Sequence, residues 1–570
     1  MLLFISRTLI AIATTVFFTA GPLAGQNLFD EGREAAASGD TLKALDIWMR
    51  AHSELDAPET RIGIAFIKLA TEAELTDRYE MASRLYFWGL EARDLEANRE
   101  ALEGEVRRID PLLSDEQSAE WRKLLNNADP ELFERITGFW QSVDPTPLSS
   151  YNERLIEHWE RIAYAEAHYP KSRKEFLKTG DRGAIYIRYG RPNRIHKGLL
   201  QFNSSMARAW ISEIVVRATN SPNAASSLSP LIEYKIRQMK DFYTAPRYEI
   251  WIYDHPKSET ENLIYIFGTN AQTGEMMGLL DSAEDMIPRG AFSMYDRGET
   301  ATRQVNPNPV IDNIRPGVIY QLMYYDQLAT VDHYFGERFE RIRSQVVTQG
   351  APSVGSGKSI AYQHRNEMEK MQRSAPEEQS TYEQGMVDIP LKVYQYRLLD
   401  NANKPYLATI MQSRPQKAFR IDFFANYPQA STASADNSLN MNSVDQNRLD
   451  NYTLVHGLRL YNQEWDLLTQ GRFDPAIVTG ADKPSVSVFN VPHVGEQVIQ
   501  VFAAELHNYD DESSYGYGAS PFPNYLRGTG EVQKRQPAER LNTSFASLEM
   551  GDLVIGYEKR EPISENDLFP

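Results

Sequence analysis

Residues 248–253 read YEIWIY and residues 263–268 read LIYIFG, and these two runs decide the fold class of the middle of the chain. Aliphatic and aromatic side chains follow one another in both, which is typical of strands. Upstream, residues 180–192 read GDRGAIYIRYGRP. Ile185 and Ile187 alternate there with tyrosine and arginine, which predicts another strand, and the closing Gly-Arg-Pro predicts the turn that ends it.

Helical patterns lie on both sides of these strands. Residues 152–168 place apolar side chains at i, i+3 and i+4, which predicts a helix that Asp144 or Ser149–Ser150 can cap. Further helical patterning falls within residues 198–243, which we interpret as an insertion at the edge of the domain. Residues 129–343 therefore predict a central α+β domain.

The preceding residues, 26–128, contain an internal repeat. Small and aromatic residues recur at a fixed offset, so that Ala44, Trp48 and Ala51 in one block correspond to Ala82, Tyr86 and Gly89 in the next. This block resembles the tetratricopeptide repeat, in which antiparallel helix pairs stack at a period of about 34 residues. The resemblance implies a concave face that binds a protein or peptide. A plain helical bundle that only packs on the next domain is the alternative.

The last third of the chain, residues 388–570, is rich in short strand patterns that turn signals separate. We expect strands at 391–397, 406–412, 419–424, 452–461, 485–491 and 497–507. Without helices between them, such strands predict an antiparallel β-sandwich of immunoglobulin-like general form. Residues 344–387 are polar and predict a flexible linker. The predicted fold class is thus multidomain α+β.

The first residues, 1–25, have the layout of a secretory signal peptide. Arg7 is their only charge, an apolar run follows it, and small residues precede Gln26. A buried helix or an uncleaved anchor is the alternative. We expect the protein to be exported to the periplasm or the extracellular space, with no transmembrane segment in the mature chain because no later apolar run is long enough.

Composition excludes several classes of function. The 570 residues carry a formal net charge of -18 and no cysteine, which argues against nucleic acid as a partner and removes thiolate metal sites and disulfides. Residues 355–359 read GSGKS, but the glycine and strand that a phosphate-binding loop needs before them are missing, so we expect no bound nucleotide. No metal-ligand spacing stands out, and we expect no cofactor.

One resemblance joins the blocks of the middle region. The pieces FW at 139–140, DPTP at 144–147, NE at 152–153, and the later DRGAIYIRYGRPN, PRYEIWIYD and LIYIFG occur in this order. This order resembles the GWxTD domain family of exported bacterial proteins, over about residues 129–278. Residues 176–181 read FLKTGD, which departs from the family signature by lacking its Gly-Trp start. The resemblance implies a compartment but no established activity.

Charged side chains cluster around the predicted strand ends of this region. Asp181 and Glu249 are the candidate acid and base. The candidate ligand-binding residues share a cationic or aromatic side chain suited to carboxylate, phosphate, sugar or peptide contacts, and they are Arg182, Arg188, Arg191, Arg194 and Trp251. The alternative is structural: the carboxylates pair with arginines, with Glu249 opposite Arg188 across the sheet.

Two functions are compatible with these observations. The first is an exported, non-catalytic cell-envelope protein that acts in protein–protein interaction or scaffolding, with another envelope or secreted protein as its partner. The alternative is a secreted hydrolase with its site near Asp181, Arg188 and Glu249. The absence of recognisable catalytic motifs favours the first.

Overall fold

The computed structural model describes the chain in two compact units. Unit 1 comprises residues up to 110, residues 114–163 and residues from 380 onwards, and unit 2 comprises residues 111–113 and 164–379. Unit 2 is therefore inserted into the sequence of unit 1. The described residues are 27–145, 147–170, 177, 179–254, 262–271, 273–292, 309–348, 354–376, 379–380, 389, 391–399, 405–414, 453–463, 465–476, 483–492, 499–507, 525–528 and 532–533.

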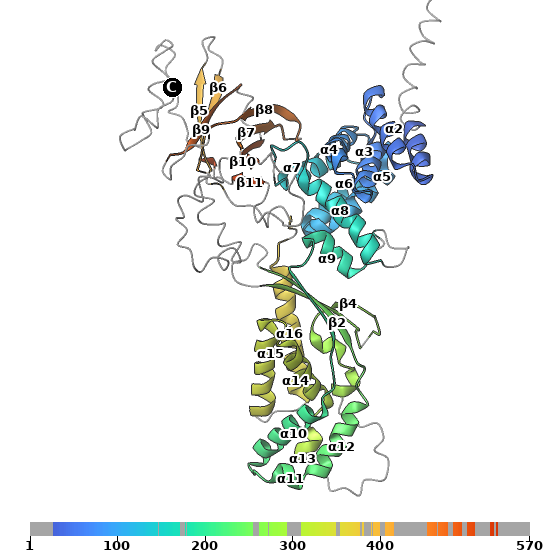
Figure 1. The fold of residues 1–570 in the computed structure, drawn as a ribbon, viewed down its shortest axis with the longest axis vertical. Coiled ribbons are helices and arrows are strands. Elements are labelled where there is room, and N and C mark those ends of the chain that lie inside the picture. The colour runs from blue at the N-terminus through green and yellow to red at the C-terminus, as the bar shows by residue number, and fades with distance from the viewer. Residues whose placement is uncertain are drawn as a thin grey trace, which may run out of the picture. The chain divides into compact units, whose positions relative to one another are not determined.

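Unit 1 begins with a series of short helices, which confirms the predicted helical region (Figure 1). After a helix at 27–37 come α2 (Thr41–Glu54), α3 (Thr60–Glu72), α4 (Tyr79–Leu90), α5 (Leu95–Ile109), α6 (Asp115–Asn126), α7 (Glu131–Ser142) and α8 (Glu153–His168). Several begin at a side chain that accepts a backbone N–H, such as Asp40, Asp94 and Ser114.

Small residues in this series allow neighbouring helices to approach closely. A Cβ atom at Gly32 would meet the indole of Trp48, and one at Gly63 would meet the backbone carbonyl of Leu85. The turn between the first two helices has Gly39 at φ +87°, a conformation that favours glycine. Close packing of each helix pair therefore depends on these positions.

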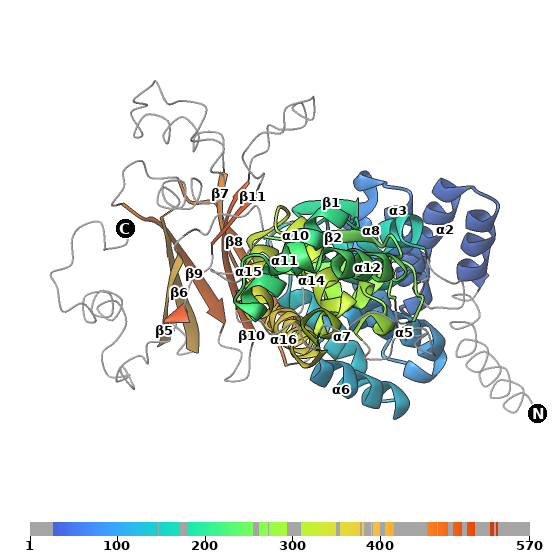
Figure 2. The same ribbon diagram turned by 90° about the horizontal axis from the view of Figure 1, so that it is seen from below.

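The same unit contains two four-stranded sheets, seen side by side in Figure 2. Their orders are β11-β10-β7-β8 and β12-β5-β6-β9. The strands are β5 (Leu391–Leu399), β6 (Pro405–Ser413), β7 (Thr453–Tyr461), β8 (Leu467–Phe473), β9 (Ser485–Pro492), β10 (Ile499–His507), β11 (Tyr525–Gly528) and β12 (Val532–Gln533). All pairs are antiparallel except β12 with β5. Apolar residues of both sheets form one cluster, including Val393, Leu458 and Phe489.

Most of the expected C-terminal strands are confirmed. The expected strand at 419–424 lies outside the described residues, and β8, β11 and β12 were not expected. The sequence signal of β8 is weak because nearly every side chain in it is exposed, so the strand has no alternation of apolar and polar residues.

Helices and sheets of unit 1 are in direct contact. A Cβ atom at Gly138 of α7 would meet the indole of Trp465, in the turn between β7 and β8. The backbone N–H of Leu148 donates to Glu505 Oε1 of β10 at 3.1 Å. Arg93 Nη2 lies 2.7 Å from Asp466 Oδ1. Residues far apart in sequence are thus joined into one unit.

Unit 2 is built on an antiparallel sheet of order β1-β2-β3-β4. Its strands are β1 (Arg194–Leu199), β2 (Arg247–Tyr253), β3 (Leu263–Gly268) and β4 (Gly278–Leu280). Its longer helices are α9 (Asp181–Tyr189), α10 (Ser204–Thr219), α12 (Ser229–Lys240), α14 (Pro316–Leu328), α15 (His333–Arg343) and α16 (Val354–Arg373), with the short α11 (Ala224–Ser227) and α13 (Pro309–Asn313) between them. The expected strands in β2 and β3 are confirmed.

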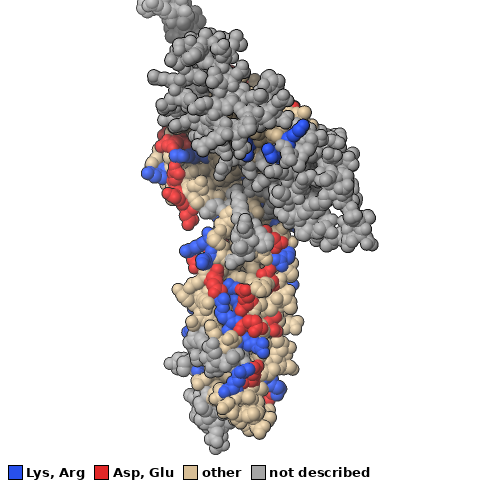
Figure 3. All heavy atoms as spheres, turned by 90° about the vertical axis from the view of Figure 1, so that its left-hand side faces the viewer, with Lys and Arg blue, Asp and Glu red and all other residues tan. Residues whose placement is uncertain are grey.

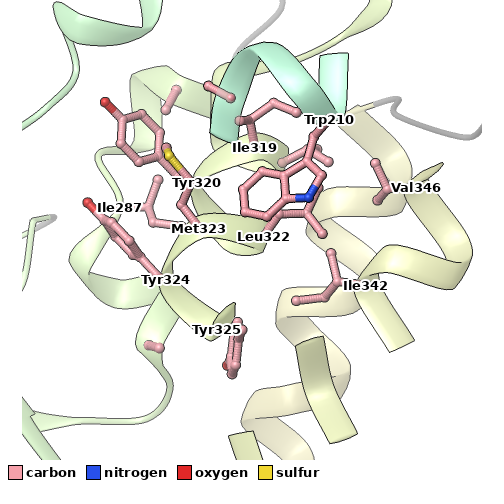
Figure 4. Close-up of a cluster of buried hydrophobic side chains, with 14 of the residues drawn as sticks. Trp210, Ile287, Ile319, Tyr320, Leu322, Met323, Tyr324, Tyr325, Ile342 and Val346 are labelled. Atoms are coloured by element: carbon pink, nitrogen blue, oxygen red, sulfur yellow. The ribbon is translucent and has the colours of Figure 1, made fainter. Parts of the chain in front are cut away.

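The two faces of this sheet are covered by different helices. Ile250, Ile252, Ile264 and Ile266 belong to a large cluster with α10, α12, α14 and α16. Figure 4 shows the α14 side chains of this cluster beside Trp210 of α10 and Ile342 of α15. The opposite face, with Trp251, Tyr253, Tyr265 and Phe267, packs on Ile185 and Tyr189 of α9.

Two local predictions were wrong. Residues 181–189 form helix α9 and no strand. Ile185 and Tyr189 are four residues apart, so a helix places both on the face that packs against the sheet, and this packing outweighs the short alternation. The helix at 153–168 is confirmed, but its capping residue is Asn152, whose Oδ1 accepts the Leu155 N–H at 2.8 Å.

Two segments that were not expected to form the core, a predicted edge insertion and a predicted linker, contribute to the core of unit 2. Residues 198–243, interpreted as an edge insertion, provide the end of β1 and the helices α10 to α12, with Ile211, Ile214 and Met239 fully buried. Residues 344–387, expected to form a flexible linker, contain α16, and the GSGKS stretch lies in its first turns. Gly357 packs there against Val318 of α14.

Candidate functional site

The carboxylate of Glu249 is the centre of the candidate site predicted from sequence. It lies on β2, is only 3 % exposed, and accepts a hydrogen bond from Arg182 Nη1 at 3.2 Å. Lys197 Nζ, on the adjacent strand β1, lies 3.3 Å from Glu249 Oε1. The Trp251 indole N–H donates to the same Glu249 oxygen at 2.7 Å. The Glu249 carboxylate thus contacts three side chains of unit 2. Two of them, Arg182 and Trp251, were candidate ligand-binding residues in the sequence.

Asp181 does not reach this carboxylate group. It is the first residue of α9, and its Oδ2 accepts the backbone N–H of Leu279 in β4 at 3.1 Å. This hydrogen bond connects the first residue of α9 to the edge strand β4. Asp181 and Glu249 therefore do not form an acid and base pair around a shared opening.

Three predicted arginines are distributed over separate contacts. Arg188 Nε donates to the carbonyl of Pro111 at 2.7 Å and is not the partner of Glu249. Arg194 forms ion pairs at 3.0 Å with Asp254 and with Asp332. Arg191 is exposed in the turn before β1.

Trp251 is completely buried, which removes it as a stacking surface for a ligand from solution. Its ring packs against Phe267 and Tyr169. Burial also raises the pKa of Tyr169 to about 12, so this hydroxyl stays protonated at neutral pH. These aromatic groups stabilise the α9 face of the sheet.

Several residues that carry the GWxTD resemblance in the first helices are also buried, among them Trp140, Asn152 and Glu153. Trp140 Nε1 donates to the Tyr86 hydroxyl at 3.1 Å, and that hydroxyl donates to Glu105. The Asn152 side chain donates to the Trp140 carbonyl, and Glu153 is fully buried. The motif thus holds α4, α5, α7 and α8 of unit 1 together.

Comparisons with models of protein families, with curated proteins and with solved structures gave no match. Within the described ranges, no group of three or more His, Cys, Asp or Glu side chains could hold a metal ion. None of the helices that the structure describes is long and apolar enough to span a bilayer.

Unit 2 also contains a groove with a polar lining. It has a volume of about 640 Å³ and lies between α15, the second half of α16 and the start of β3. Ile264, Tyr334 and Met371 are among the residues that line it. Basic and acidic residues are interspersed over the surface of unit 2 in the view of Figure 3. A groove of this size and lining can accept a small polar molecule or a few residues of a peptide.

Charged side chains connect the two helices that form the groove. Arg338 is 6 % exposed, and its Nη2 lies 2.7 Å from Glu367 Oε2 while its Nη1 donates to the Tyr334 carbonyl at 2.9 Å. Arg341 Nη1 lies 2.6 Å from Glu367 Oε1. Burial opposes ionisation of Glu367, but the hydrogen bond from Arg341 and the charge of Arg338 outweigh it and lower the pKa of this carboxyl.

Sequence reasoning missed this groove. The spacing of Tyr334, Arg338 and Arg341 along α15 does place them on one face of a helix. The opposite wall was missed because residues 354–373 read as polar linker, so Glu367 and Lys370 had no predicted element. Only the packing of α16 on α14 and α15 brings the two charged faces together.

Proposed function

We propose that the protein is an exported, non-catalytic protein of the cell envelope that binds another envelope or secreted protein. In this proposal the helices of unit 1 act as a tetratricopeptide-like binding region. The C-terminal sheets act as an immunoglobulin-like sandwich that spaces or docks it, and the middle of the chain is a GWxTD-like domain. The periplasm or the extracellular space is the proposed compartment.

The observation that supports the proposal most directly is that both candidate catalytic carboxylates make structural contacts within the fold. Glu249 is buried under Arg182, Lys197 and Trp251, and Asp181 accepts a backbone N–H of β4. A general acid or base needs a reachable proton-transfer atom near the substrate. Their arrangement therefore supports a structural use of these carboxylates over a hydrolytic one.

The first experiment tests export. The full chain is expressed with its own N-terminus in a Gram-negative host, and the protein is recovered from the periplasmic and extracellular fractions. We expect the recovered chain to begin near Gln26. Recovery only from the cytoplasm, with Met1 or its neighbours still present, would contradict the proposal.

The second experiment tests binding through unit 1. Leu42 of α2 is 56 % exposed, so a photo-crosslinking residue placed there reports contacts of the helical region, and Tyr234 of α12, 55 % exposed, is the matched control in unit 2. We expect crosslinks to a specific protein from position 42 only. With that protein purified, Leu42→Asp is expected to weaken binding about tenfold and Tyr234→Asp to leave it unchanged.

The enzymatic alternative gives a different result. A panel of ester, glycoside and peptide substrates is tested with the wild-type chain and with Glu249→Gln. Turnover that this substitution abolishes without lowering the melting temperature would identify Glu249 as catalytic and overturn the proposal. A lower melting temperature with no turnover in either protein agrees with a structural carboxylate.

A further inference from the structure

The edge strand β8 carries apolar side chains that are about half exposed. Leu467 is 48 % exposed, Leu468 43 % and Phe473 50 %. The strand ends the sheet β11-β10-β7-β8, so among the described strands it pairs only with β7. An edge with unpaired backbone groups and apolar side chains is a template for a further strand.

The exposed ring of Phe473 points toward the space between the two sheets. A Cβ atom at Gly471 would meet the ring of Phe489 in the other sheet, and Phe473, two residues on, shares that face of β8. Its neighbour on β7 in the strand register is His456, which is fully buried between the sheets. Phe473 thus faces inward and is still half exposed, so the described strands leave this space open beside β8.

The sequence after β12 contains one run with the pattern of a further strand. Residues 552–557 read DLVIGY and include the only three consecutive aliphatic residues after position 533. In an extended conformation Leu553, Ile555 and Tyr557 share one face, and the alternate positions, which begin with Asp552, share the other. The first face suits an apolar interior, and the second suits the outside of a sheet.

This run can reach β8 within the same chain. The last described residues form β12, at one edge of the sheet β12-β5-β6-β9, and β9 is the other edge. The distance across that sheet is about 15 Å at the usual strand spacing, and β8 contacts β9 through Gly471 and Phe489. Residues 534–551 extend to about 60 Å when fully stretched. Such a tether raises the effective concentration of the run at β8 above that of a separate partner.

We propose that residues 552–557 add to the outer edge of β8 as a further strand. Backbone hydrogen bonds then satisfy this edge, and Leu553 and Ile555 cover Phe473 on the inner face. The tail of the chain occupies a site that another extended chain could otherwise enter. The inference concerns the two sheets of unit 1 alone and does not depend on the proposed function.

Disulfide mapping on the full mature chain tests the contact directly, because the protein has no cysteine of its own. Val554→Cys is combined in turn with Leu468→Cys, Gln470→Cys and Arg472→Cys, on the outer face of β8. We expect one pair to form an intramolecular disulfide, since opposite residues of neighbouring strands come within reach of each other. The matched control is Val488→Cys of β9, 43 % exposed in the other sheet, which is expected to give no disulfide with Val554→Cys.

Three outcomes of this mapping overturn the proposal. A disulfide that forms preferentially at position 488 places the tail on the other sheet. Disulfide-linked dimers show that a second copy provides the strand. No disulfide at any position shows that the tail does not pair with β8, and the edge is then left to a separate partner.

A pair of neighbouring substitutions tests the face of the added strand. Ile555→Asp directs a charge into the space between the sheets, so we expect it to lower the melting temperature of unit 1 by several degrees and to speed hydrogen exchange in residues 467–473. Val554→Asp, on the outer face, is expected to change both measurements little. Equal effects of the two substitutions, or no effect of either, would count against strand addition.

Discussion

At the scale of single residues, buried histidines show how the fold fixes a protonation state. His456 of β7 is fully buried between the two sheets of unit 1, with Ser413 Oγ 2.7 Å from its Nε2 and Ser487 Oγ 2.7 Å from its Nδ1. Burial lowers its pKa to about 4. The ring is therefore neutral in the folded sheets at any pH above this value.

This shift predicts a loss of stability in mild acid. Between pH 6.5 and about 4 the unfolded chain binds a proton at this histidine and the folded chain does not, so stability falls as the pH falls, by about 3 kcal/mol over the window. The measurement is the unfolding free energy of wild type and His456→Gln from pH 4 to 7.5. We expect the variant to lack this part of the pH dependence.

An exposed histidine provides the control for this prediction. His333→Gln, at a side chain that is 85 % exposed, is expected to retain the part of the pH dependence that His456→Gln loses. The ring itself is followed by NMR. A titration of His456 near pH 6.5 would contradict the prediction.

At the scale of elements, ion pairs decide how α16 docks on α15. Glu367 bridges Arg338 and Arg341 of α15, whereas Glu369, two residues on, pairs with Arg373 of its own helix. The first glutamate thus connects two elements and the second stabilises one. This difference gives a matched pair of substitutions within one helix.

We expect Glu367→Gln to weaken the docking of α16. The substitution leaves Arg338 buried without its carboxylate partner, which costs about 1–3 kcal/mol given that Glu367 is 31 % exposed. Hydrogen exchange of amides in residues 354–373 should become faster, while Glu369→Gln changes them little. Equal exchange in both variants would show that the bridge does not hold the helix.

Much of the secondary structure could be predicted from sequence, and the errors have a common cause. The apolar runs of β2 and β3 are long enough to specify strands by themselves. The alternation in residues 181–189 is shorter and is also compatible with a helix, and the polar composition of α16 hides its narrow apolar face. In both cases the deciding contacts come from segments distant in sequence.

In the candidate site, Arg182 and Trp251 lie beside Glu249. Asp181 instead accepts the N–H of Leu279, and Arg188 donates to the carbonyl of Pro111. Arg194 pairs with two aspartates. Residue type indicates what a side chain can bind. Only the fold determines which partner lies within reach.

At the scale of the whole molecule, the division into two units predicts two unfolding transitions. The helices and sheets of unit 1 share contacts such as that of Gly138 with Trp465, so we expect them to unfold together, separately from unit 2. Calorimetry of the full chain measures this directly. Gly63→Ala should lower the transition of unit 1 by several degrees, because the added methyl meets the Leu85 carbonyl.

The second unit provides the reciprocal control. Glu367→Gln should lower only the other transition, since its partners Arg338 and Arg341 belong to unit 2. A single transition that both variants shift, or separate transitions for the helices and sheets of unit 1, would contradict this organisation.

The sequence by itself determined the helical N-terminal region, the strands β2 and β3, most C-terminal strands and the lack of cysteine chemistry. Each follows from local periodicity or composition, which needs no knowledge of neighbours. The tertiary structure decided that 181–189 is a helix, that α16 is part of unit 2, that the first helices and last sheets form one unit, and that Glu249 pairs with Arg182. These four features depend on which surfaces, distant in sequence, pack against each other. Burial and ion pairing act between elements, so local sequence patterns indicate them only weakly.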